Sequence, residues 1–233
     1  MNNSLQSHTV SSYDSELKDI TKDLKEMGKL VGEILAVFSG FVSGAAGDAS
    51  SEVTAIDKKI NKLNEDVEGK ALNVIALRNP LAVDLRFVVS SIKIATILER
   101  MGDIAKSSTN NLVKHDSEVA KKYEKDLSKM SELVTKMINN SVKGFGKFDT
   151  EKADKVWSKE DKVDDLAESL FDKLQNDMSN KSSVAEAMSL LLVIKNLERM
   201  GDYATNVTKI VHYVASGERW SENSSKPKSK KID

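Results

Sequence analysis

The hexapeptide Leu-Glu-Arg-Met-Gly-Asp occurs twice in the chain, at residues 98–103 and 197–202. In a helix, its glutamate and its aspartate lie four residues apart and share one face, where like charges repel by about 0.2–0.5 kcal/mol. Carboxylate oxygens without sulfur ligands are typical of sites for Mg, Mn, Fe or Zn. The carboxylates of the two copies are Glu99, Asp103, Glu198 and Asp202. Each copy is therefore a candidate metal site.

Two other predicted helices carry polar pairs with the same spacing. Asp57 and Asn61 form one pair, and Glu160 and Asp164 form the other. Each pair belongs to the middle helix of its half of the chain. If that helix packs beside a hexapeptide, its acids join the same cluster, which favours a metal site in both halves.

An alternative needs no ligand. Arg100, Arg199 and nearby lysines can neutralise the acids, as charge pairs on the flanks of helices often do. Gly102 and Gly201 are unfavourable by up to about 1 kcal/mol inside a helix. Their benefit is the close approach of a neighbouring helix, or of a ligand, beside the carboxylates. The residues leave both interpretations open.

Composition excludes several classes of protein. A net charge of -1 gives no overall attraction for nucleic acid, and the lack of cysteine excludes disulfides and thiolate metal sites. No apolar stretch approaches the roughly 20 residues that span a bilayer, and we expect a cytoplasmic protein. None of the three histidines lies in a Glu-x-x-His pattern, and no nucleotide-binding or nucleophile motif is present, so we predict no catalytic residues and no organic cofactor.

Apolar residues recur every three to four positions, so the sequence predicts an all-α fold. With short connections, the six long helices form two tandem antiparallel three-helix bundles related by pseudo-twofold symmetry. Asp48 is expected to cap the second helix, Asn79 and Pro80 to start the third, Asp149 or Thr150 to cap the fifth, and Ser183 with Glu186 to cap the sixth. The predicted helices are 13–42, 48–78, 80–113, 117–144, 150–180 and 183–216.

The duplication also predicts the domain organisation. Residues 13–114 form the first bundle and residues 115–217 the second. Residues 1–12 are an expected flexible N-terminus. The basic, low-complexity residues 218–233 are an expected disordered tail.

Several segments together resemble the PhoU family of bacterial phosphate-regulation proteins. They are the duplicated LERMGD followed by Ile-Ala or Tyr-Ala, NPLAVDLR at 79–86, the opening HTVSSYDSELKDITKDLKEMGKLV and the closing IVHYVASGE. The resemblance covers residues 8–218. It implies tandem three-helix bundles, in agreement with the helical pattern.

The resemblance also implies a function. Members of the family act in the cytoplasm as negative regulators of the phosphate (Pho) response and of phosphate uptake. They work between the ATPase subunit of the phosphate ABC transporter and a membrane sensor histidine kinase, and so reach the inner face of the membrane through partners. Dimers are common, and some members bind multinuclear Fe or Zn clusters. An adaptor without enzymatic activity is therefore expected, most simply a homodimer.

Carried over by position, the family's metal ligands form two sets. The first comprises Asp57, Glu99 and Asp103, and the second comprises Glu160, Asp164, Glu198 and Asp202. Asn61 and Asn64 stand where the family often has carboxylates, so the first set is poorer in charge. We expect the second set to bind metal better.

Other functional classes predict different features. A carboxylate-bridged oxidase needs open metal coordination and a redox reaction, and the lack of nearby histidine disfavours it. A carboxylate-bridged metal-binding helical protein without a Pho-signalling role is the alternative function. A protein that lies on the membrane surface needs helices that open onto lipid, which the regular core pattern disfavours. Gly28, Gly32 and Gly40 make the first helix a candidate docking surface, with tolerated packing glycines as the alternative.

Overall fold

The computed structural model describes residues 11–115, 118–178 and 184–220. These residues form helices and no strands, so the all-α prediction is confirmed. None of the helices in these ranges is both long and apolar enough to cross a membrane. The helical segments are α1 (Ser11–Val42), α2 (Ala49–Arg78), α3 (Ala82–His115), α4 (Glu118–Lys122), α5 (Glu124–Phe145), α6 (Thr150–Asp154), α7 (Trp157–Met178) and α8 (Val184–Ser216).

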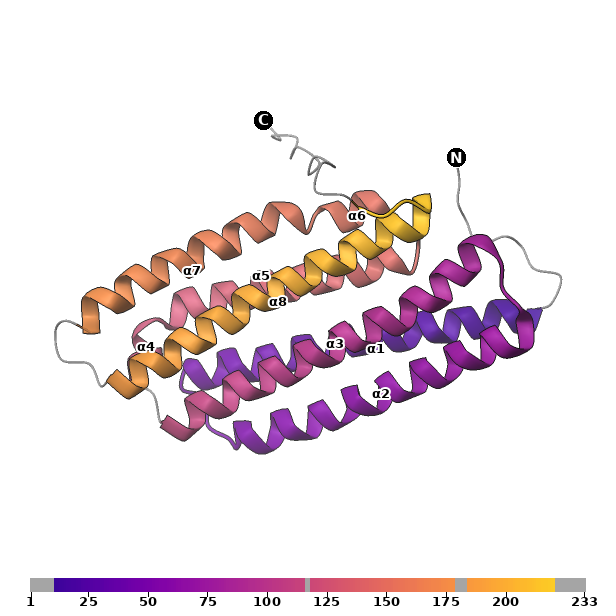
Figure 1. Cartoon of the computed structure of the whole chain (residues 1–233). Helices are drawn as coiled ribbons and strands as arrows, with labels where there is room; N and C mark the ends of the chain where they lie inside the picture. Colours follow the sequence, from indigo (N-terminus) through magenta and orange to yellow (C-terminus); the bar gives the residue numbers. More distant parts are fainter. Residues whose placement is uncertain (1–10, 116–117, 179–183, 221–233) are drawn as a thin grey trace.

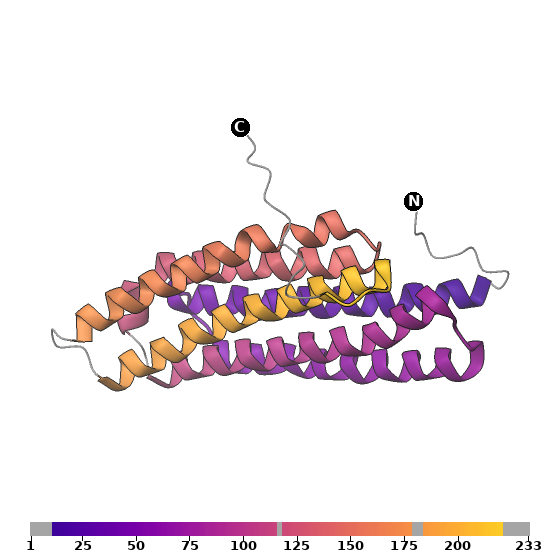
Figure 2. The same cartoon turned by 45° about the horizontal axis from the view of Figure 1, so that its top comes forward.

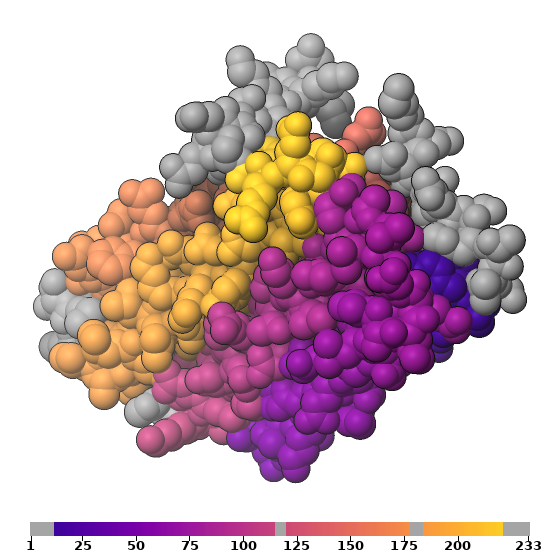
Figure 3. Space-filling view, turned by 45° about the vertical axis from the view of Figure 1, so that its right-hand side comes forward, coloured from indigo at the N-terminus to yellow at the C-terminus, as the bar shows by residue number. Residues whose placement is uncertain are grey.

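The six long helices form two bundles that pack side by side (Figures 1 and 2). Helices α1, α2 and α3 contact one another in the first bundle, and α5, α7 and α8 contact one another in the second. The bundles meet where α1 packs against α5 and α3 packs against α8, which leaves α2 and α7 on the outside. In the space-filling view, α3 and α8 lie in contact along the surface (Figure 3). The predicted pair of three-helix bundles is confirmed, whereas the boundary at residue 114 stays a prediction.

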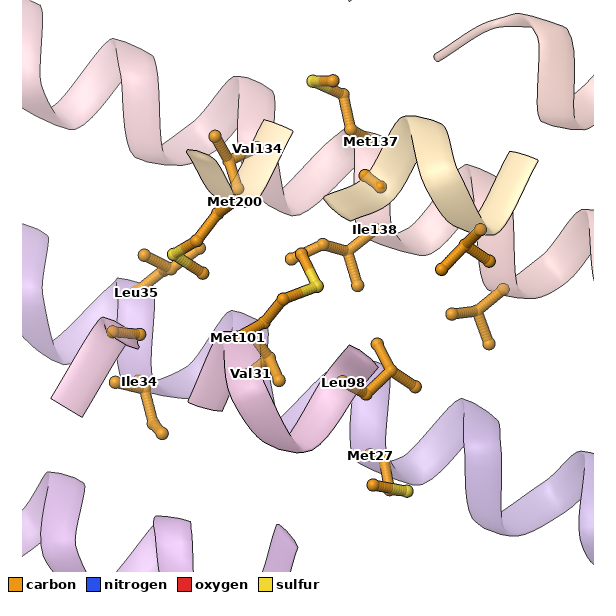
Figure 4. Close-up of a cluster of buried hydrophobic side chains, with 14 of the residues drawn as sticks. Met27, Val31, Ile34, Leu35, Leu98, Met101, Val134, Met137, Ile138 and Met200 are labelled. Carbon is orange, nitrogen blue, oxygen red and sulfur yellow. The ribbon is translucent and has the colours of Figure 1, made fainter. Parts of the chain in front are cut away.

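One hydrophobic core runs through both bundles. Met101 of α3 and Met200 of α8 are both fully buried. They lie in one cluster with Leu35 of α1 and Ile138 of α5 (Figure 4). The methionine of each hexapeptide therefore helps to join the two halves, and four helices share its surroundings.

The glycines of α1 serve this packing. A Cβ atom added to Gly32 would lie 3.1 Å from Cγ2 of Thr135, and one added to Gly28 would lie 3.4 Å from Cγ2 of Val142, both on α5. Since these positions face a neighbouring helix of the same chain, the docking interpretation is wrong for Gly28 and Gly32. A Cβ atom added to Gly40 would lie 3.7 Å from Cβ of Ala45, which follows α1 in the chain.

Most helix ends follow the predictions, and one does not. Asp48 accepts a hydrogen bond from the backbone N–H of Ser51 at 3.0 Å and caps α2, as expected. Asn79 was expected to begin the third helix, but it ends α2 in the left-handed conformation with φ 47°. Asparagine tolerates this conformation, and Pro80 cannot continue a helix. The third helix therefore begins at Ala82.

Two predicted helices are interrupted. The fourth divides into α4 and α5 at Tyr123, whose buried side chain donates a hydrogen bond from its hydroxyl to Asp177 of α7. The fifth divides into α6 and α7 after Lys155, although Asp149 caps its first turn as predicted. The capping residue predicted for the last helix, Ser183, lies outside the described residues.

Truncating the shared core tests its importance. Met101→Ala is expected to lower the free energy of unfolding by about 2–5 kcal/mol, because it leaves a cavity between the bundles. Leu72→Ala is the control: that side chain is 53% exposed on α2, and its truncation is expected to change stability by less than about 0.5 kcal/mol. Urea denaturation measures both. Equal effects of the two variants would contradict a shared core at Met101.

Candidate functional site

The helical period of the hexapeptides determines where their acids lie. Leu98 and Leu197 are each 1% exposed, and the following methionines are fully buried. Because residues three apart in a helix share a face, these apolar side chains turn the glutamate and aspartate to the margin of the core. In both copies, the glutamate is half-buried and the aspartate is exposed.

The glycine allows close helix packing in the first copy. A Cβ atom added to Gly102 would lie 2.9 Å from Cδ1 of Ile60 and 3.8 Å from Oδ1 of Asp57, both on α2. At Gly201 the nearest atoms are Cε of Met137 at 3.5 Å and Cγ1 of Val163 at 3.6 Å. The predicted close approach of a neighbouring helix is therefore confirmed at Gly102, where that helix is α2, and the packing at Gly201 is looser.

We call Asp57, Glu99 and Asp103 the first acidic cluster. Its compensating charge is Lys106, whose Nζ donates to Oδ2 of Asp57 at 2.6 Å and to Oδ1 of Asp103 at 2.7 Å. Asp57 is only 4% exposed, and its Oδ1 has no hydrogen-bond partner within the described part of the chain. The ammonium group thus stands between two of the predicted metal ligands.

This arrangement shifts the pKa values of Glu99 and Lys106. Burial raises the pKa of Glu99, and the negative charge of Asp103 raises it further, while Arg100 acts in the opposite direction. Burial disfavours the charged form of Lys106, but hydrogen bonds to Asp103 and Asp57 outweigh that effect and raise its pKa. The first acidic cluster is therefore held together by an internal cation.

We call Glu160, Asp164, Glu198 and Asp202 the second acidic cluster. Here Nζ of Lys195 lies 2.6 Å from Oε2 of Glu198, and the lysine side chain is 62% exposed. Lys106 lies three residues after Asp103; in the second copy, Thr205 lies three residues after Asp202 and donates to its carbonyl oxygen at 2.7 Å. The second cluster therefore has a lysine at its exposed edge, and threonine stands at the position that corresponds to Lys106; the charge of Lys209 also acts on Asp202.

The acids of α7 and α8 lie within electrostatic reach of one another. Loss of hydration raises the pKa of Asp202, as do the charges of Glu160 and Glu198. The hydrogen bond to Glu198 raises the pKa of Lys195, and the charges of Asp164 and Asp202 contribute to the same shift. The structure thus brings the predicted residues of each half together around one pair of helices.

Neither cluster forms a closed coordination sphere. Among the described residues, no three Asp, Glu or His side chains are close enough together to hold one metal ion. The oxygen donors suit hard cations chemically. A metal bound between Asp57 and Asp103 would require Lys106 to move.

The sequence offered Arg100, Arg199 and nearby lysines as the neutralising cations, and the structure shows the lysines as the hydrogen-bonding partners of the acids. Arg100 affects Glu99 only through its charge, and Arg199 lies over the ring of Tyr203 at 5.8 Å. Lysines neutralise the acids instead. Their positions, three residues from an acid on the same helix, were the available signal.

A pair of matched substitutions tests the internal cation. Lys106→Met is expected to lower the free energy of unfolding at neutral pH by about 2–4 kcal/mol, because it leaves the buried carboxylate of Asp57 unpaired. Lys195→Met removes an exposed partner and is expected to change stability by less than about 1 kcal/mol. Urea denaturation measures both, and equal losses would contradict the difference between the clusters.

Comparison with known proteins gives the family. The model of the PhoU domain matches residues 24–111 and 127–211. The phosphate-specific transport system accessory protein PhoU homolog of Caulobacter vibrioides is 33% identical over 213 residues, which cover 91% of this chain and 93% of that protein. The homolog of Zymomonas mobilis is 32% identical over 216 residues, with 92% and 91% covered. The crystal structure of PhoU from Pseudomonas aeruginosa superimposes with a TM-score of 0.76 at 24% identity, covering 88% of this chain and all of that one. The chain belongs to the PhoU family.

Proposed function

We propose that this chain is a cytoplasmic, non-enzymatic negative regulator of phosphate uptake and of the Pho response. The observation that carries the proposal is the match, over nine-tenths of the chain, to relatives that are named accessory proteins of the phosphate-specific transport system. The fold is compatible with this role, because a rigid pair of bundles offers long helical surfaces on which other proteins can dock.

The proposed partners are the ATPase subunit of the phosphate ABC transporter and a sensor histidine kinase, which recruit the chain to the inner face of the membrane. A homodimer is also proposed. Regulation of this kind needs only a difference in affinity for two states of a partner. Exposed apolar side chains are typical of contact surfaces. Six of the large exposed apolar side chains lie just before or in the first turns of α3 and α8: Leu81, Leu85, Val89, Val184, Met188 and Leu192.

Metal binding is a second part of the proposal. We propose that the second acidic cluster takes Fe or Zn, with Mg or Mn as further candidates, and that the first cluster binds more weakly. Two observations support this order: threonine stands at position 205, where the first cluster has Lys106, and the charges of Glu160 and Glu198 act on Asp202. When bound, such an ion would supply charge that links α7 to α8, and the chain's own carboxylates would hold it.

Deletion of the gene tests the regulatory role. In phosphate-rich medium, the deletion is expected to raise alkaline phosphatase activity, and the intact gene is expected to restore a low level. The physical reason is loss of the docked regulator that holds the kinase in its phosphatase state. Low activity in the deletion strain would exclude control through the kinase.

Metal content tests the difference between the clusters. Glu198→Ala with Asp202→Ala is expected to reduce bound metal more than Glu99→Ala with Asp103→Ala, because Lys106 already neutralises the first cluster. Mass spectrometry of protein loaded with Zn or Fe gives the metal content per chain. Circular dichroism controls for folding. Equal loss of metal in the two variants would contradict the proposal that the second cluster binds metal better.

A further inference from the structure

A basic groove runs between α1 and α5, the layer that lies behind α3 and α8 in Figure 1. Its volume is about 660 Å³, and five of its lining residues are lysines while only one is acidic. The whole chain has a net charge of -1, so this positive charge is local. The lining residues are Lys18, Thr21, Lys22, Lys25, Glu26, Lys29, Asn139, Lys143 and Gly146.

Within the described part of the chain, most of these lysines form no ion pair with an acid. Lys29 is the exception, since its Nζ lies 3.6 Å from Oε1 of Glu26 and 3.0 Å from Oε1 of Glu33. No Asp or Glu side chain in the described ranges forms an ion pair with the other four, which are Lys18, Lys22, Lys25 and Lys143. All four are exposed. The groove therefore presents cations that remain available to a partner.

The lysines of α1 form one row. Positions 18, 22, 25 and 29 recur with the period of a helix, so they share a face and extend over roughly 16 Å at about 1.5 Å per residue. Lys143 adds a cation from the wall formed by α5. A Cβ atom added to Gly146 would lie 2.6 Å from Cγ2 of Thr21 and 3.4 Å from Cε of Lys25, so the turn after α5 touches α1 here. The groove is therefore an elongated surface that α1, α5 and the turn after α5 form together.

The shape and lining of the groove distinguish between anionic partners. A row of this length is too long for a single small anion. A flat bilayer fits poorly into a concave groove, and none of the large exposed apolar side chains of the described residues lies on α1 or α5 to enter lipid. No aromatic side chain lines the groove to stack on bases. An elongated acidic peptide satisfies these constraints.

We propose that the groove between α1 and α5 binds an acidic segment of a partner protein. Carboxylates spaced along that segment pair with the lysine row of α1 and with Lys143. Such complementarity accelerates association and fixes the register of the partner on the helical surface. The proposal uses neither acidic cluster and does not depend on the proposed phosphate role.

Charge reversal in the full-length protein tests the groove. The variant Lys22→Glu, Lys25→Glu, Lys143→Glu removes three cations from the groove. The control Lys114→Glu, Lys125→Glu, Lys129→Glu changes the net charge equally at exposed lysines outside the groove. The probe is a fluorescently labelled oligoglutamate peptide, with binding followed by anisotropy at low and at physiological ionic strength. Circular dichroism checks that both variants fold.

The expected result is saturable binding of the peptide that weakens about tenfold or more in the groove variant and less than about threefold in the control. Absence of binding, or equal weakening in both variants, would overturn the proposal. Vesicles of phosphatidylserine and a single-stranded RNA are tested in parallel. Groove-dependent binding to either of these, without groove-dependent binding of the peptide, would also overturn it and assign the groove to that ligand.

Discussion

The burial of one leucine and one methionine from each hexapeptide in the shared core constrains the rest of the structure. Met101 and Met200 pack among four helices, so the rotation of α3 and α8 about their axes is fixed. Once these side chains point inward, the glutamate and the aspartate of each copy must lie at the margin, next to α2 or α7. The same packing that joins the two bundles therefore also forms the two acidic clusters.

Identical hexapeptides nevertheless produce unequal electrostatics. Lys106 bridges Asp57 and Asp103 in the first cluster, whereas Thr205 stands at the matching place in the second. The tighter packing at Gly102, against Ile60, accompanies deeper burial of an acid in the first half. A buried carboxylate needs a partner, and here the chain supplies it. The first cluster is thus stabilised by an internal lysine, while in the second cluster the lysine that pairs with Glu198 is exposed.

Sequence periodicity was sufficient to predict the long helices and the buried face of each hexapeptide, because both depend on residues close in the chain. The sequence-based predictions fail where contacts between residues that are distant in the chain determine the structure. Tyr123 interrupts a predicted helix while its hydroxyl contacts Asp177, more than fifty residues away. The lysine row of α1 was visible in the sequence, but its groove exists only because α5 of the other half packs beside it. Asn79 was predicted to start a helix and instead ends one, because asparagine suits both positions and the local sequence does not choose between them.

The family assignment places these features in a relative of phosphate-transport accessory proteins, with acidic clusters beside α2 and α7 and a lysine-lined groove between α1 and α5. The two acidic clusters differ in charge because Lys106 neutralises the first one from within. Anomalous diffraction from crystals grown with a zinc salt tests this directly. We expect anomalous density at the second acidic cluster and none at the first, with Lys106 between Asp57 and Asp103. Equal density at both clusters, with Lys106 displaced, would contradict this expectation.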